Sequence, residues 1–373
     1  MRRRIFKLKV NIMSMLTIKK ALQKINKKVI FVSAGIHLSE KAIIDSLSLS
    51  HINHYKFDLK TKFIGTRLRF ASKTVKAIKN FIILPKSYEY YIIQAGHTPI
   101  LLLKALKIFR KKIILWINTG LPFELKANKV NFVLRYLLRY ADGFISIGKM
   151  NYDVISEFFP RKPNFLVYPI ITQKPRFRMT PRLNSHNILF WAGLGDKTGA
   201  YLPKRAYYKG ADIVIGAFNL LKKRVPSLKL YIVGSYSEAT ISSLGKHKGV
   251  YFLGYVKDIR VPIEKCCVAV NPGRGDAFPL TSLETSFLGL PTIVSKYTGI
   301  KEIIEKIDKR LVSPATVNGL ANALSGYFSL SLDRKLSLSK RSILAVKKFY
   351  RQYSIEGAQR NYLKFIESLD TKK

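Results

Sequence analysis

A chain of 373 residues with 47% hydrophobic residues is too long for one ordinary domain, and it can bury a sizeable core, which excludes global disorder. The net charge of +44 favours partners that carry negative charge, such as nucleic acid, an anionic membrane or phosphorylated substrates, although a proteome-wide bias toward lysine and arginine would also produce it. The only two cysteines, Cys266 and Cys267, are adjacent in an apolar run, which excludes a disulfide scaffold and predicts two small core residues.

Residues 1–27 are predicted to form a basic N-terminal extension. Lys7 and Lys9 interrupt any signal-peptide core, and no run of about 20 apolar residues predicts a membrane span. Two interpretations stay open, a disordered basic arm and a helix lying on a membrane surface. The residues that would share the apolar face of that helix are Ile12, Met15, Leu16, Leu22 and Ile25.

Residues 28–178 alternate short apolar runs with stretches of helical periodicity, which predicts a first α/β domain. The run Val29–Ala34 ends at Gly35, as expected for a strand followed by a tight turn. Strand, helix and strand then follow at the spacing of a parallel βαβ unit. The predicted strands are Val29–Ala34, Tyr90–Gln94, Ile113–Ile117, Gly143–Ile147 and Phe165–Tyr168, and the predicted helices are Glu40–Leu49, Ile100–Phe109 and Asn131–Tyr140.

A linker over Thr172–Ser185 precedes a second domain, predicted at 185–345, in which the alternation restarts. A C-terminal helix is expected over 346–373, within a helical stretch from Ser342 to Ser368. Two such halves predict two Rossmann-like, doubly wound parallel-sheet domains that bind ligands beyond the carboxyl ends of their strands. The further strands are Ile188–Ala192, Leu228–Val233, Val250–Leu253, Val268–Asn271 and Thr292–Ser295, and the further helices are Gly210–Arg224, Leu280–Leu288 and Leu320–Phe328.

The richest segment for chemistry runs from Asn271 to Glu302. Asp276 lies in the loop after a predicted strand, and Glu284 lies near the beginning of the next helix. The helix start between them offers N–H groups that favour negative charge, although a carboxylate there can also be a simple cap. Glu284 lies among apolar residues, so a buried carboxylate is expected, and such a group needs a partner, for which ribose hydroxyls are suitable.

Five motifs follow one another in the second half: Lys209-Gly210 before a helix, LYIVG over Leu230–Gly234, VYFLGYV over Val250–Val256, the Asp276 and Glu284 pair, and GLPTIVS over Gly289–Ser295. In this order and spacing, residues from about 185 to 325 resemble the C-terminal domain of glycosyltransferase family 4. The first half resembles that family more weakly, in Tyr140–Ile155 and Leu166–Ile170. The resemblance implies a GT-B enzyme, with two domains facing a cleft and a last helix that packs back on the first domain.

The resemblance also implies a donor site. Glu284 would hold the donor ribose, Asp276 would contact the transferred sugar, and Lys209 would neutralise the leaving diphosphate. Backbone N–H groups of Ala277, Phe278, Pro279 and Leu280 would face sugar hydroxyls and the diphosphate. The turn from Gly254 to Val256 would lie against the base, and Gly35, Gly193 and Gly234 would be the other glycine turns of the site.

Three positions depart from the family pattern. Asp276 stands where the family usually has Glu. Leu194 stands where an Arg is common, so Lys197, Lys204 or Arg205, in a predicted long loop, is a candidate second cation. Asn118 and Thr119 stand where members often carry a His, which leaves His97 as the candidate catalytic histidine and His37 as a weaker alternative.

The sequence contains no Asp-x-Asp triplet and no Cys/His cluster with metal-ligand spacing, so metal-independent transfer without a cofactor is expected. The expected function is retaining transfer of a hexosyl group from a nucleotide-sugar to a glycan or polyprenyl-phosphate-linked acceptor. The enzyme would be cytoplasmic, with a hypothesis of peripheral binding to an anionic membrane surface at its inner face, and no specific nucleic acid is expected. The alternatives are a transferase-like protein with lost or epimerase-type activity and a basic nucleic-acid-binding protein.

Overall fold

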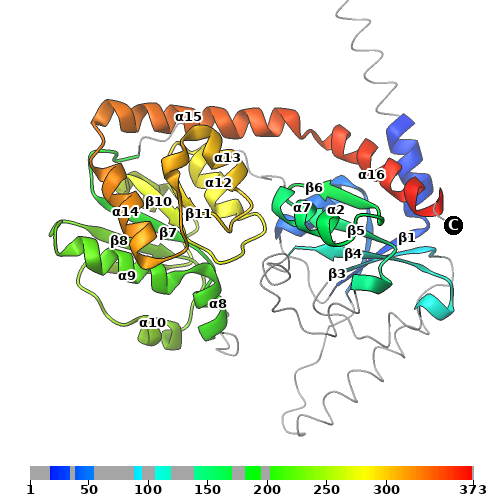
Figure 1. Cartoon of the computed structure of the whole chain (residues 1–373), viewed down its shortest axis with the longest axis horizontal. Coiled ribbons are helices and arrows are strands. Elements are labelled where there is room, and N and C mark those ends of the chain that lie inside the picture. Colours follow the sequence, from blue (N-terminus) through cyan, green and yellow to red (C-terminus); the bar gives the residue numbers. More distant parts are fainter. Residues whose placement is uncertain are drawn as a thin grey trace, which may run out of the picture. The chain divides into compact units, whose positions relative to one another are not determined.

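The computed structural model describes residues 17–33, 38–53, 88–94, 106–118, 138–169, 181–194 and 202–371. The chain divides into two compact units, one formed by Met1–Ile170 with Tyr353–Lys373 and the other by Ile171–Gln352. Each unit contains a six-stranded sheet in which every described strand pair is parallel (Figure 1). The predicted fold class of two Rossmann-like α/β domains is therefore confirmed.

The described strands of the first unit have the order β2-β1-β3-β4-β5-β6. Apolar runs form most of these strands, because a parallel sheet is covered on both faces and leaves no solvent face for polar residues, whereas the β2 sequence SHIN has no apolar run. Phe31 of β1 and Trp116 of β4, for example, are fully buried and meet edge to face at 5.1 Å. The strands are β1 (Val29–Ser33), β2 (Ser50–Asn53), β3 (Tyr90–Gln94), β4 (Lys112–Ile117), β5 (Gly143–Ile147) and β6 (Asn164–Val167), and the helices with described bounds are α2 (Leu38–Ser46), α7 (Lys149–Phe158) and α16 (Ile355–Thr371).

Residues 17–26 are helical and belong to the core of the first unit. Leu22 is 2% exposed, so it is not available to a membrane, as one of the two open interpretations required. The Asn26 amide donates to the carbonyls of Leu47 and Ser48 at 2.7 and 3.0 Å, and Tyr362 donates to its Oδ1 at 3.3 Å. These bonds join the stretch to the end of α2 and to α16, which an unstructured arm would not do. Ile12, Met15 and Leu16 lie outside the described residues.

The last helix, α16, packs on the sheet of the first unit. A Cβ added to Gly143 would lie 2.8 Å from Leu369, so glycine permits this close approach, and Phe365 stacks on Phe165 at 5.7 Å. The single predicted helical stretch from Ser342 to Ser368 is wrong, because two residues separate the end of α15 (Leu332–Gln352) from the start of α16. Ser354 in the break accepts a hydrogen bond from Gly357 N at 3.1 Å, which caps the new helix.

The second sheet has the order β12-β11-β10-β7-β8-β9. If β7 is counted as strand 1 and the sheet is read from β9 to β12, the order is 3-2-1-4-5-6, as in dinucleotide-binding folds. The strand order reverses between the neighbouring strands β7 and β10, and this place is called the reversal point below. Cys266 and Cys267 are fully buried here, as predicted. The strands are β7 (Asn187–Trp191), β8 (Lys229–Val233), β9 (Val250–Gly254), β10 (Val268–Asn271), β11 (Thr292–Ser295) and β12 (Val312–Ser313), and the helices before α15 are α8 (Leu202–Lys209), α9 (Ala211–Lys222), α10 (Glu238–Leu244), α11 (Arg260–Lys265), α12 (Leu280–Phe287), α13 (Lys301–Ile307) and α14 (Val317–Phe328).

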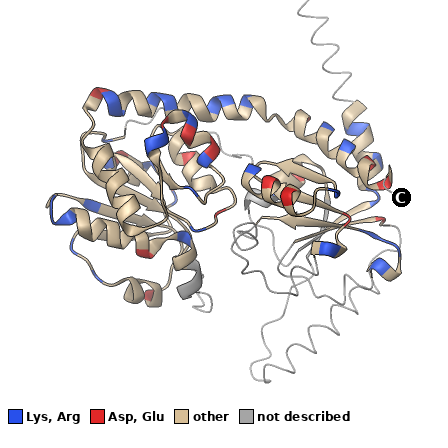
Figure 2. Cartoon of the chain, in the orientation of Figure 1, with Lys and Arg blue, Asp and Glu red and all other residues tan. Residues whose placement is uncertain are grey.

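Lysine and arginine residues are distributed over helices and strands of both units (Figure 2). The imbalance is larger in the first half, where residues 1–180 carry 35 Lys and Arg against 8 Asp and Glu, compared with 31 against 14 in residues 181–373. None of the described helices is both long and apolar enough to cross a membrane.

Candidate functional site

The glycine turns of the second unit lie at the carboxyl ends of β7, β8 and β9, beside the reversal point. Gly234 has a φ of 136°, and a Cβ there would lie 2.1 Å from the carbonyl of Ala192, so only glycine lets the loops after β7 and β8 approach so closely. Gly234 N donates to the Gly254 carbonyl at 2.9 Å. The predicted donor-site residues Gly193, Gly234 and Gly254 thus share one edge of the sheet, with Val256 two residues beyond β9.

The structure brings Lys209 and Asp276 together at this edge. Lys209 ends α8, and Gly210 then adopts a left-handed conformation with a φ of 77° before α9 begins. A Cβ on Gly210 would lie 2.6 Å from the Pro272 carbonyl, so the helix junction sits directly against the loop after β10. The Lys209 Nζ lies 2.5 Å from Asp276 Oδ2, with side chains 22% and 12% exposed. This partly buried ion pair joins two residues 67 positions apart.

Arg274 holds the same loop in place, and the sequence analysis missed it. Its guanidinium makes a two-pronged ion pair with Asp212 of α9 at 2.8 and 2.7 Å and lies 3.8 Å from the centre of the Tyr207 ring. Its backbone N–H donates to the Tyr208 carbonyl at 2.8 Å, and the Tyr208 hydroxyl donates to the Gly275 carbonyl. The loop that carries Asp276 is therefore fixed to the α8–α9 junction on both sides of Lys209.

Glu284 lies in the first two turns of α12 and is partly buried. Burial raises the pKa of its carboxyl to about 7. No described residue donates a hydrogen bond to this carboxylate. The polar side chains next to it along α12 have other partners: Ser282 accepts from Asn271 at 3.0 Å, and Thr285 shares a hydrogen bond with Thr292 at 2.9 Å. Glu284 thus has unused acceptor capacity for the hydroxyl groups of a ligand.

The segment from Ala277 to Leu280 leads into the N-terminus of α12. The Asp276 carbonyl accepts from Gly299 N at 2.8 Å, and a Cβ on Gly299 would lie 1.7 Å from the Ala277 carbonyl, so the loops after β10 and β11 are in contact. Pro279 has no N–H group and cannot donate, which corrects the prediction for that residue. The Phe278 ring is 6% exposed and stacks on Phe349 at 5.7 Å. Backbone N–H groups at the helix start remain available for an anion, because the first turn of a helix leaves its donors unused.

The structure describes only some of the other predicted site residues. His97, His37, Gly35 and Thr119 lie outside the described residues. Arg205 and Lys204 belong to α8, not to the long loop that the sequence predicted, and only the backbone of both is described. Lys197 also lies outside the described residues, whereas Asn118 directly follows β4 at the carboxyl edge of the first sheet.

The raised pKa of Glu284 predicts how the free energy of unfolding depends on pH. Between about 4.5 and 7 the folded chain binds more protons than the unfolded chain, so stability falls as the pH rises through this window, and the full penalty applies above pH 7. Glu284→Gln is expected to raise the free energy of unfolding at pH 8 by up to about 3 kcal/mol and to leave it unchanged near pH 5. Denaturant unfolding at both pH values measures this. The exposed Glu264→Gln is the matched control, and a Glu284→Gln effect that is equal at pH 5 and pH 8 would contradict the assignment.

Comparison with known proteins identifies the second unit. Residues 198–329, which include Lys209, Asp276 and Glu284, match the family described as glycosyl transferases group 1. The chain carries a group 1 glycosyltransferase domain. Together with the relatives below, this match supports an enzyme that transfers glycosyl groups.

Sequence relatives match part of this chain. A mannosylfructose-phosphate synthase of Agrobacterium fabrum is 28% identical over 196 residues, which is 48% of this chain and 43% of that protein. An uncharacterised glycosyltransferase of Bacillus subtilis is 26% identical over 172 residues, or 44% of this chain and 45% of that protein. The chain thus matches less than half the length of these curated relatives.

Solved structures share the fold over most of the chain. Sucrose-phosphate synthase from Thermosynechococcus elongatus has a TM-score of 0.65 at 14% identity and covers 93% of this chain and 100% of its own. An Anabaena protein in complex with UDP and glucose has a TM-score of 0.59 at 14% identity, with 92% and 100% covered. At this identity the likeness shows the GT-B fold alone.

Among the described residues, no group of three or more His, Cys, Asp or Glu side chains is placed to hold a metal ion. At the candidate site, the Lys209 ammonium group faces the Asp276 carboxylate.

Proposed function

We propose that the chain is a retaining glycosyltransferase that moves a hexosyl group from a nucleotide-sugar to a glycan or lipid-linked acceptor without a metal ion. The observation that carries this proposal is the placement of the Lys209–Asp276 ion pair at the carboxyl edge beside the reversal of the second sheet. Ligands of open α/β sheets bind at that position. The group 1 glycosyltransferase domain over 198–329 supports the reaction class.

In this proposal each residue has one task. Glu284 accepts hydrogen bonds from the donor ribose, a role suited to a partly buried carboxylate without a protein donor. Lys209 turns from Asp276 toward the diphosphate as negative charge develops on the leaving group. Asp276 then contacts the transferred sugar, and N–H groups at the start of α12 face the diphosphate. The leaving phosphate helps to deprotonate the acceptor hydroxyl, so the protein mainly stabilises charge.

The remaining parts of the proposal concern the acceptor and the location. The positive first half is suited to an acceptor that carries phosphate, such as a polyprenyl-phosphate-linked sugar, at the inner face of an anionic membrane. The second cation of the donor site is proposed to be Arg205, because α8 also carries Lys209. His97 is proposed as the catalytic histidine of the first domain.

A donor panel tests the proposal directly. Calorimetry with UDP-, GDP- and ADP-sugars in the presence of EDTA is expected to show micromolar binding of one donor, and similar structures solved with UDP make UDP-glucose the first choice. Nuclear magnetic resonance of the product should show the anomeric configuration of the donor. Binding that requires added Mg²⁺, or a product of inverted configuration, would contradict the proposed mechanism.

A further inference from the structure

A cavity of about 480 Å³ lies at the amino edge of the first sheet. Lys112 begins β4, Asp142 immediately precedes β5, and Pro163 immediately precedes β6, so the cavity spans the starts of three parallel strands. Leu369 of α16 closes one side of it. Substrates of Rossmann-like sheets bind at the carboxyl edge, which is the opposite one. The cavity is therefore separate from any substrate site on this sheet.

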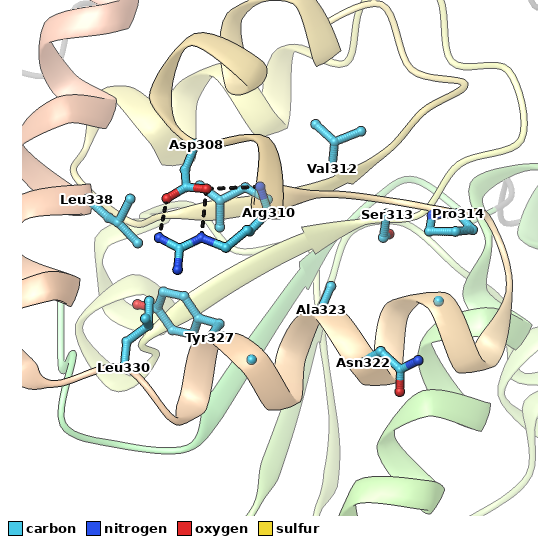
Figure 3. Close-up of a pocket in the computed structure, with 13 residues that line it drawn as sticks. Asp308, Arg310, Val312, Ser313, Pro314, Asn322, Ala323, Tyr327, Leu330 and Leu338 are labelled. Atoms are coloured by element: carbon cyan, nitrogen blue, oxygen red, sulfur yellow. Dashed lines mark hydrogen bonds and ion pairs between the residues drawn. The ribbon is translucent and has the colours of Figure 1, made fainter.

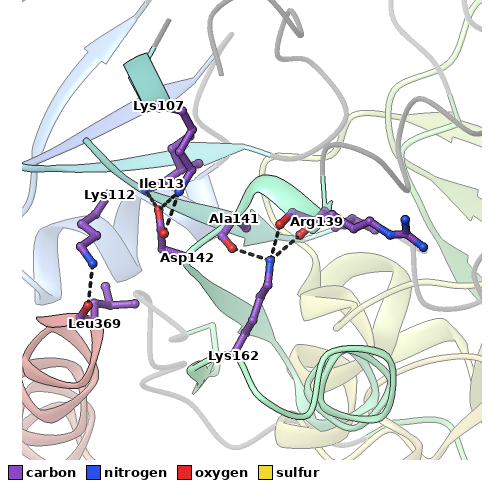
Figure 4. A network of polar contacts seen from close by, with 9 residues as sticks. Lys107, Lys112, Ile113, Arg139, Ala141, Asp142, Lys162 and Leu369 are labelled. Atoms are coloured by element: carbon purple, nitrogen blue, oxygen red, sulfur yellow. Dashed lines mark hydrogen bonds and ion pairs between the residues drawn. The ribbon is translucent and has the colours of Figure 1, made fainter. Parts of the chain in front are cut away.

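Cations dominate the lining of this cavity. Five basic side chains line it and one carboxylate, that of Asp142, opposes them. Lys107 meets both oxygens of Asp142 at 2.7 Å, and Ile113 N donates to one of them at 2.7 Å (Figure 4). The only acidic side chain among the described residues of the lining is thus already neutralised. The basic residues are Lys107, Lys112, Arg139, Arg161 and Lys162.

Two of the lysines are directed at carbonyl groups of helix ends. Lys162 donates to the carbonyls of Arg139 and Ala141 at 2.5 and 2.6 Å, where the helical residues 138–140 end, and burial lowers the pKa of its ammonium group. Lys112 donates to the Leu369 carbonyl in α16 at 2.9 Å. Each helix end contributes at most roughly half a negative charge. Among the described residues of the lining, the five basic side chains therefore outnumber the negative groups, which are Asp142 and the two helix ends.

The Arg139 guanidinium makes no hydrogen bond or ion pair with another described residue. Figure 4 shows that Lys162 engages the Arg139 carbonyl, while the guanidinium extends away from the ammonium group. A guanidinium matches the geometry of two phosphate oxygens, and clustered lysines add unspecific attraction for the same group. The chemistry that this cavity recognises best is therefore a phosphate.

We propose that this cavity is a binding site for a phosphate group, separate from the donor site on the second unit. The phosphate belongs either to a soluble phosphorylated molecule or to the headgroup of an anionic lipid, and both present the same oxygens to Arg139, Arg161 and the neighbouring lysines. The proposal does not depend on the proposed reaction, because the cavity lies in the first unit and no donor-site residue described above lines it.

The test removes the two arginines and retains the lysines that neutralise helix ends and Asp142. The double variant Arg139→Gln/Arg161→Gln is compared with wild type in two arms, calorimetry with glycerol phosphate and co-sedimentation with phosphatidylcholine vesicles that contain phosphatidylglycerol. For a soluble ligand, wild type binds glycerol phosphate and the variant binds it at least about tenfold more weakly. For a lipid headgroup, wild type sediments with the anionic vesicles, and the variant loses about tenfold in partitioning.

A second pair of variants separates the site from general charge loss. Lys246→Gln/Lys248→Gln removes two exposed charges from the second unit and is expected to bind like wild type in both arms. The single variant Arg139→Gln, at an exposed side chain, is measured in case the double variant unfolds, and it should show part of the loss. The proposal is overturned if the arginine variants bind like wild type in both arms, or if the lysine pair loses as much.

A second cavity, of about 380 Å³ between β12 and α14, carries no comparable assignment. Among the described residues that line it, the only charged groups are Asp308 and Arg310, which pair with each other at 2.6 Å (Figure 3). Tyr327, Leu330 and Leu338 make the remaining lining largely apolar at one end.

Discussion

Replacing Lys209 with alanine is expected to reduce kcat/KM for glycosyl transfer by about 100- to 1000-fold. Removing one preorganised group that stabilises developing charge typically has an effect of this size. Lys209 lies 2.5 Å from Asp276 at the carboxyl edge, so its loss also leaves that carboxylate without its cation. Steady-state release of the nucleotide from the donor found in the panel measures the effect. Lys209→Arg retains the positive charge but carries it on a planar guanidinium group, so this variant should recover part of the rate.

Two controls distinguish a direct role of Lys209 in the reaction from a loss of the fold. Lys229→Ala removes an exposed lysine at the amino end of β8, on the opposite edge of the same sheet, and should leave kcat/KM unchanged. The thermal midpoint of Lys209→Ala should fall by only a few degrees, because a partly exposed ion pair contributes about 1 kcal/mol or less. A rate within threefold of wild type would show that the Lys209–Asp276 pair is structural.

The strands could be predicted closely because parallel sheets bury both faces. Tyr90–Gln94, Gly143–Ile147, Val268–Asn271 and Thr292–Ser295 stand in the structure with the predicted bounds. β2 was missed because its sequence, SHIN, has no apolar run. α8 was taken for a loop because LPKRAYYK contains a proline and three basic residues and has no apolar run.

The site was predictable only where residues lie close in the chain or follow a known motif. Lys209 and Asp276 were identified through their motifs, but their direct contact depends on Gly210, whose left-handed conformation places α8 against the loop after β10. The Arg274–Asp212 pair joins residues 62 positions apart and belongs to no motif, so only the folded chain shows that it fixes this loop. The cavity at the amino edge of the first sheet could not be predicted either, because four separate segments of the chain form it and no motif connects them.

Replacing Glu284 with alanine is expected to weaken donor binding by about 100-fold. Hydrogen bonds from ribose hydroxyls to a charged acceptor contribute about 1.5–3 kcal/mol each, and alanine removes them. Calorimetry with the donor found in the panel measures the change. Glu305→Ala, which removes an exposed carboxylate of α13 in the same unit, serves as the matched control and should bind like wild type.

The pH dependence of the same binding gives an independent check. Burial raises the pKa of Glu284 to about 7, so the carboxylate that accepts ribose hydroxyls is largely protonated at pH 6 and largely ionised at pH 8. Donor affinity of wild type should therefore rise severalfold from pH 6 to pH 8, in the opposite direction to the stability of the free protein, and Glu284→Gln should show neither trend. Stability and donor binding change in opposite directions with pH. The buried charge of Glu284 destabilises the protein when the site is empty, whereas hydroxyl groups of a bound donor stabilise the same charge by donating hydrogen bonds to it. An affinity that is equal at both pH values, or a Glu284→Ala variant that binds like wild type, would remove Glu284 from the donor site.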